Sequence, residues 1–93
     1  MLQNIATVDV FEVIGVKDYE TTFKAFLNED RDIVDEDRAV KLSLKHRIED
    51  ELAEFDVTQS EPEDYSVSIP DEYDRRVMRE YMVTVTPLSR GQQ

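Results

Sequence analysis

The chain has 93 residues, a formal net charge of −11 and no cysteine, and 40% of its residues are hydrophobic. That length is typical of a single domain, which we expect to span residues 1–93 with a polar tail over about 88–93. The lack of cysteine excludes disulfides and thiolate chemistry. The charge argues against direct binding to nucleic acid, because neutralising phosphates requires clustered lysine and arginine. It argues equally against binding to an anionic membrane surface.

The start of the chain, MLQNIATVDV, has no basic region and no long apolar stretch, so we expect no secretory signal. No stretch approaches the roughly 20 apolar residues that a membrane-spanning helix needs. We therefore expect the protein in the cytoplasm, or within a virus particle assembled there. Lysines are fewer than arginines, and aspartate and valine are abundant, as in proteins from salt-adapted sources.

The first half of the chain predicts one strand and one helix. Residues 6–16, ATVDVFEVIGV, carry apolar side chains on both parities, which predicts a strand covered on both sides, with Gly15 at a bulge or close approach. Asp18 then resembles a helix N-cap. The apolar residues that follow recur at helical spacing and predict a short helix over about residues 19–28: they are Tyr19, Phe23, Phe26 and Leu27.

The stretch NEDRDIVDEDRA, residues 28–39, is dominated by carboxylates around a small apolar anchor, Ile33-Val34. Its last acids precede a second periodic segment and favour the positive end of a helix dipole. That segment predicts a helix over about residues 36–56, with an apolar face formed by Val40, Leu44, Ile48, Leu52 and Phe55. We therefore interpret the acidic stretch as a solvated turn that joins two helices, although the alternation in AVKLSLK leaves a strand open.

The second half predicts a loop and two strands. Pro62 and its polar neighbours predict the loop. YSVSI, residues 65–69, predicts a short strand, and residues 80–86 predict another. Residues 71–79 are open between a helix and an extension of that strand. The fold class is therefore expected to be α+β, with a small antiparallel sheet of two or three strands packed against two helices.

Candidate sites for metal ions or catalysis are weak. Asp30, Asp32, Asp35 and Asp37 offer oxygen ligands, but the run has no glycine, and Val34 stands where a calcium loop needs its third ligand. His46 is the only histidine, and no Gly-x-Ser-x-Gly elbow is present. We therefore expect no metal, no cofactor and no enzymatic activity.

Charge is polarised along the sequence. Residues 29–74 are strongly acidic, whereas residues 75–93 hold four arginines against Glu80 alone. This polarity predicts a head-to-tail contact between copies, or docking on a larger partner. The predicted interface residues are Arg75, Arg76, Arg79, Tyr73 and Tyr81. The competing interpretation is that these arginines pair with acids of the same subunit.

The leading hypothesis is a non-enzymatic structural or assembly protein that forms a homo-oligomer or a larger assembly. A minor virus-particle subunit from a salt-adapted source, such as a connector, tail or decoration protein, fits this class. The alternative hypothesis is an acidic DNA mimic that inhibits a nucleic-acid-binding host defence enzyme. Its phosphate-like face would consist of Glu49, Asp50, Glu51, Glu54 and Asp56, which an ordinary amphipathic helix also explains.

Overall fold

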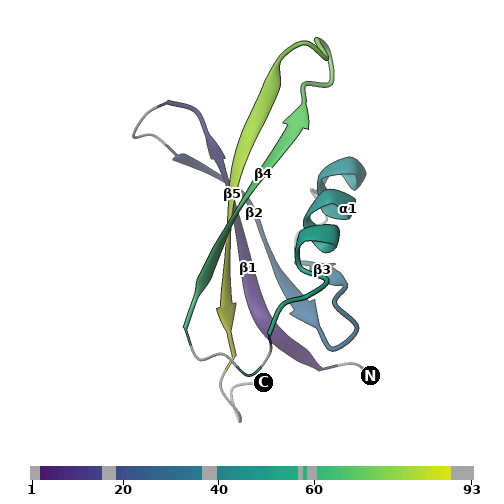
Figure 1. The fold of residues 1–93 in the computed structure, drawn as a ribbon, viewed down its shortest axis with the longest axis vertical. Coiled ribbons are helices and arrows are strands. Elements are labelled where there is room, and N and C mark those ends of the chain that lie inside the picture. The colour runs from purple at the N-terminus through teal and green to yellow at the C-terminus, as the bar shows by residue number, and fades with distance from the viewer. Residues whose placement is uncertain (1–2, 16–18, 37–39, 57, 59–60, 89–93) are drawn as a thin grey trace.

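The computed structural model describes residues 3–15, 19–36, 40–56, 58 and 61–88. The described chain contains strands β1 (Asn4–Val13), β2 (Tyr19–Asn28), β3 (Ile33–Asp35), β4 (Glu63–Pro70) and β5 (Met78–Pro87), and helix α1 (Leu42–Glu51). The strands form one antiparallel sheet in the order β3-β2-β1-β5-β4. Helix α1 lies on one side of this twisted sheet, as Figure 1 shows.

The core follows the alternation of the two central strands. In β1 the even positions Ala6, Val8 and Val10 are buried, and in the register of the sheet Val8 and Val10 face Val85 and Val83 of β5. These side chains share one cluster with the buried face of α1. Because side chains alternate across a strand, the odd positions of β1 point to the opposite face.

The expected cover on both sides of the first strand is wrong for the described part of the chain. Helix α1 covers one face of the sheet, and Phe11 and Met82 on the other face are half-buried. Gly15 lies at an exposed bend after β1, and the irregularity in pairing falls between Val10 and Phe11 instead.

The predicted architecture of two or three strands against two helices is wrong, and the main error concerns residues 19–28. This segment is strand β2, in which Phe23, Ala25 and Leu27 alternate and are buried. Phe26, which suggested a helical face, is half-buried and belongs to the other side of the strand. Pairing with both β1 and β3 satisfies the backbone of β2, and such non-local pairing overrides local spacing. The proposed N-cap Asp18 lies outside the described residues.

The second helix is confirmed in its apolar face but is shorter than predicted, because α1 spans Leu42–Glu51 rather than residues 36–56. Its first turn contains no acidic residue, so the preceding acids do not stabilise the helix dipole as expected. Asp35 instead ends β3, and its Oδ2 accepts the backbone N–H of Val40 at 3.2 Å. The buried apolar face consists of Leu44, Ile48, Leu52 and Phe55.

Residues 29–32 of the acidic stretch form a hairpin turn between β2 and β3, not a turn that joins two helices, and residues 37–39 lie outside the described chain. The side-chain Oδ1 of Asn28 accepts the N–H groups of Asp30 and Asp32, at 2.9 and 3.1 Å. Arg31 takes a positive φ of 68°, which reverses the chain. This is a side-chain-supported turn of the kind that asparagine favours, and it holds the acids of the turn in a fixed shape.

The two later strands are confirmed, since residues 65–69 lie within β4 and residues 80–86 within β5. For residues 71–79 the sequence left helix and strand as alternatives. In the structure residues 71–77 form a loop, and Met78 and Arg79 are the first residues of β5. No helix in the described part of the chain is long and apolar enough to cross a membrane.

We expect Ile48→Ala to lower the free energy of unfolding by about 2–5 kcal/mol, because Ile48 is fully buried between α1 and the sheet. The matched control is Asp50→Ala on the exposed side of the same helix, which should change stability by less than about 0.5 kcal/mol. Urea unfolding followed by circular dichroism measures both. Similar losses for the two variants would contradict the packing of α1 described above.

Candidate functional site

The loop of the β4–β5 hairpin, residues 71–77, is organised by one carboxylate. Asp71 Oδ2 accepts the backbone N–H groups of Tyr73 and Asp74, at 2.9 and 3.0 Å. These N–H groups lower the pKa of the Asp71 carboxyl. The Asp71 N–H donates to the carbonyl of Val77 at 2.7 Å, which closes the loop. The loop therefore presents its side chains from a fixed backbone.

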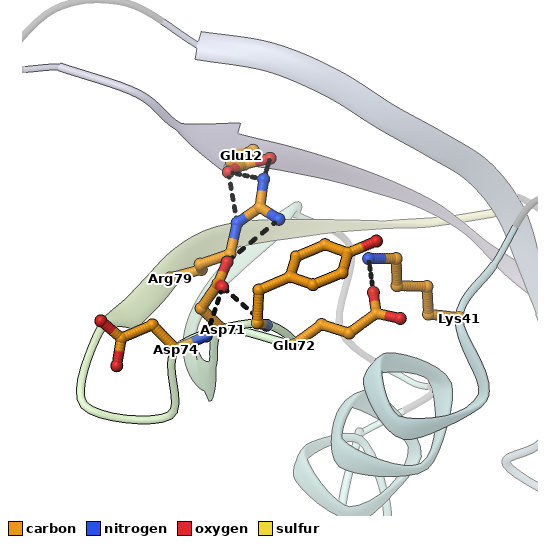
Figure 2. Close-up of polar contacts among 7 residues, drawn as sticks. Glu12, Lys41, Asp71, Glu72, Asp74 and Arg79 are labelled. Carbon is orange, nitrogen blue, oxygen red and sulfur yellow. Dashed lines mark hydrogen bonds and ion pairs between the residues drawn. The ribbon is translucent and has the colours of Figure 1, made fainter.

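Arg79 links this loop to the end of β1. Its guanidinium forks onto Glu12, with Nε 2.9 Å from Oε2 and Nη2 2.7 Å from Oε1. Its Nη1 lies 3.7 Å from Asp71 Oδ1. Figure 2 shows Arg79 between Glu12 and Asp71. Bidentate arginine–carboxylate pairs are among the stronger polar contacts, so Arg79 anchors the hairpin inside its own subunit.

A second ion pair joins the loop to the start of α1. Lys41 Nζ donates to Glu72 Oε2 at 2.8 Å (Figure 2), and this hydrogen bond raises the pKa of Lys41. Both side chains are more than half exposed, so the pair contributes little to stability. Its main effect is to hold the loop beside the helix start.

A pocket of about 560 Å³ lies between the start of α1 and the β4–β5 hairpin. Its apolar lining includes Leu42, Leu44 and Ile69, and its polar lining includes Arg75 and Tyr81. Tyr81 is only 8% exposed. The pocket therefore combines apolar walls with donors that approach from two elements.

Of the large apolar side chains exposed in the described residues, all except Val34 on β3 lie toward this end of the molecule. Tyr73 is 91% exposed, Val77 51% and Met78 48%, all on the β4–β5 hairpin. Leu42, 68% exposed, begins α1, and Ile14, 61% exposed, lies at the tip of the β1–β2 hairpin. Figure 1 shows the end of β1, the β4–β5 loop and the start of α1 toward the same end of the molecule, with the two hairpins diverging there. We call this the hairpin end; clustered exposed apolar side chains are typical of interaction surfaces.

The opposite end is acidic. It contains the β2–β3 turn, the described residues just after α1 and the start of β4, and the start of β1 and the end of β5 lie toward it in Figure 1. We call this the acidic end. Its exposed carboxylates are Glu29, Asp30, Asp32, Glu51, Glu54, Asp56, Glu61, Glu63 and Asp64. Part of the acidic segment therefore lies at this end, whereas Asp71, Glu72 and Asp74 of the same segment lie at the hairpin end.

The five predicted interface residues lie at the hairpin end but differ in exposure. Tyr73, Arg75 and Arg76 are exposed in the loop, whereas Tyr81 is buried and Arg79 is half-buried in its pair with Glu12. Arg76 pairs with Asp74 at 3.0 Å. Their role at an interface stays a prediction. Two of the three arginines in the described part of residues 75–93, Arg76 and Arg79, pair with acids of the same subunit.

The predicted acidic helix face also divides in two. Glu49 is partly buried, and its Oε1 accepts the N–H of Ile33 at 3.1 Å, which closes the outer edge of β3. Asp56 accepts both the N–H and the hydroxyl of Thr58, which lower the pKa of its carboxyl. Asp50, Glu51 and Glu54 are exposed. The phosphate-like row is therefore shorter than the sequence indicated.

Sequence reasoning missed four residues of the polar network: Glu12, Lys41, Asp71 and Glu72. The dipeptide Pro70-Asp71 was a usable turn signal for the loop. Nothing local indicates the pair of Glu12 and Arg79, which are 67 residues apart. Among the described residues no group of three or more histidines and carboxylates could hold a metal ion, and Asp37 lies outside them.

Comparison with known proteins gives no family for this chain. No protein-family model, curated protein or solved structure matches it. Function is therefore inferred from the residues and their arrangement.

We expect Glu12→Gln to destabilise the protein by about 1–2 kcal/mol, because it removes a half-buried, charge-assisted fork from Arg79. Arg76→Gln is the control: it removes a pair whose arginine side chain is 90% exposed, and it should cost less than about 0.5 kcal/mol. Thermal and urea unfolding measure both. If Glu12→Gln is as neutral as the control, Arg79 is not an internal anchor.

Proposed function

We propose that this chain is a non-enzymatic assembly subunit that associates with copies of itself through its hairpin end. The observation that supports this most is the segregation of exposed side chains. Most of the exposed large apolar side chains lie at one end, with Val34 on β3 as the exception, and most of the exposed carboxylates lie at the other, although Glu72 and Glu80 are at the hairpin end. Burial of such an apolar patch is a common driving force for protein association.

The β4–β5 loop has the properties of an interface anchor. Tyr73 stands almost fully exposed on a backbone that Asp71 holds in place. A tyrosine presented in this way loses little conformational entropy when it is buried by a partner. Arg75 is beside it and is exposed as well. Tyrosine and arginine are the residue types that dominate interface energetics.

The acidic end repels the acidic ends of other copies instead of attracting them. Its like charges disfavour contacts between two acidic ends, which restricts how copies meet. At low ionic strength the net charge of −11 also repels copies from one another at longer range. Salt screens this repulsion, so association is expected to strengthen in the saline milieu that the composition favours. A minor particle subunit such as a connector, tail or decoration protein is the class we propose.

The DNA-mimic alternative has less support. A mimic needs a row of exposed carboxylates along one face. Helix α1 is only ten residues long, and Glu49 is turned toward β3. The carboxylates at the acidic end are also distributed over three segments rather than along one rod.

We expect the wild-type chain to exceed its monomer mass of 10.9 kDa at about 2 M salt, and to do so less at about 0.1 M. The double variant Tyr73→Ser/Val77→Ser should weaken association at least about tenfold, because it removes exposed apolar anchors without touching the core. Size-exclusion chromatography with light scattering measures this. The matched control is Val34→Ser, which removes an exposed apolar side chain from β3. A wild-type chain that stays monomeric in both salts, or a loss equal for variant and control, would contradict the proposal.

A further inference from the structure

The pocket at the hairpin end contains a hydroxyl with nothing to bind. Tyr81 lines the pocket and is more than nine-tenths buried. Within the described part of the chain its hydroxyl makes no hydrogen bond, and no side-chain nitrogen or oxygen there is both sealed from solvent and unpaired. The hydroxyl oxygen is therefore open to solvent through the pocket, and it can donate to an acceptor that enters there.

Arg75 is the second available donor. Three cationic side chains line the pocket, but Lys41 is paired with Glu72, and Arg79 with Glu12. Arg75 makes no ion pair with the described residues. A guanidinium presents a planar fork of N–H groups that matches a carboxylate.

The start of α1 provides donors on the same side. Leu42, Ser43 and Leu44 line the pocket, and the N-cap residue Lys41 makes no side-chain capping bond. The first N–H groups of a helix have no partner inside the helix, and they carry the positive end of its dipole. The hydroxyl, the guanidinium and these N–H groups can all donate to an acceptor that enters the pocket.

The two acids on the pocket rim already have partners. Asp71 accepts two backbone N–H groups, and Glu72 accepts Lys41. Their charges disfavour a dianion such as phosphate more than a single carboxylate. The apolar walls formed by Leu42, Leu44 and Ile69 also suit the methylene stem of an acidic side chain.

We infer that this pocket receives a carboxylate side chain from the acidic end of a second copy. The start of α1 and the β4–β5 loop, which line the pocket, lie at the opposite end of the molecule from the β2–β3 turn, so each copy can present acids to one neighbour and receive them from another. The β2–β3 turn is the presenting segment, because Asn28 holds its exposed acids Asp30 and Asp32 in a fixed shape. This inference rests on the proposed function, since the occupant is a copy of the chain.

The test is an NMR titration of the ¹⁵N-labelled full chain with an acetylated, amidated peptide of its own residues 28–34. We expect saturable shifts at the amides of Leu42, Ser43 and Leu44. Arg75→Gln and Tyr81→Phe should each weaken binding about five- to tenfold, because each removes one donor to the carboxylate. Arg76→Gln is the control, because Arg76 does not line the pocket. Tyr81→Phe should leave the melting temperature unchanged, because its hydroxyl has no partner in the free chain.

Three results overturn the inference: no saturable shifts, shifts that survive both pocket variants, or equal shifts with the peptide in which Asp and Glu are replaced by Asn and Gln. Equal binding of free acetate, with the same dependence on Arg75, would make the pocket a small-carboxylate site and remove the second copy as occupant. Failure of the inference is distinguishable from failure of the proposed function. Association that needs Tyr73 and Val77 but is insensitive to Arg75→Gln and Tyr81→Phe keeps the function and removes the pocket's role.

Discussion

The structure depends on one apolar layer, in which the buried side of α1 packs against alternate residues of the sheet. This layer is short. A ten-residue helix is about 15 Å long, whereas a ten-residue strand extends about 33 Å. Strands β1, β2 and β5 have ten residues each, as does the helix. The strands must therefore extend beyond the helix that covers them.

The hairpin end follows from this mismatch in length. Beyond the start of α1 there is no further helix in the described chain to cover β1 and β5. The side chains that face that space are Glu12 and Arg79, paired with each other, and the hydroxyl-bearing Tyr81. A polar network thus replaces the apolar core where the helix stops, and the pocket forms at the boundary. The same overhang leaves Tyr73 and Val77 exposed, so the candidate site is a consequence of how the core is built.

The spacing of apolar residues along the chain predicted the elements that local sequence determines. Runs of β-branched and aromatic residues identified β1, β4 and β5, and the four-residue spacing of Leu44 and Ile48 identified the buried face of α1. Strand β2 was missed because its aromatic residues fit both periods, and its pairing with β1 and β3 is decided by distant residues. Strand β3 has only three residues, too few to show a period.

The sequence predicted which segment carries the candidate site, but it did not predict which residues pair with one another there. Tyr73 and Arg75 are exposed on the β4–β5 hairpin, in the segment that the clustering of tyrosine and arginine had marked as a candidate interface. Counting charges along the chain could not reveal that Glu12, from the other end of the sequence, neutralises Arg79. Nor could it reveal that Tyr81 is buried, because that depends on where α1 ends over the sheet.

The central claim is that the overhanging hairpin end is the surface through which copies meet. Hydrogen–deuterium exchange, compared between the dilute monomer and the associated protein, tests it most directly. The account predicts slower exchange in the loop 71–77 and at the start of α1 upon association, because the partner shields these surface segments from solvent and disfavours their local opening. Association that leaves exchange in both segments unchanged would contradict it.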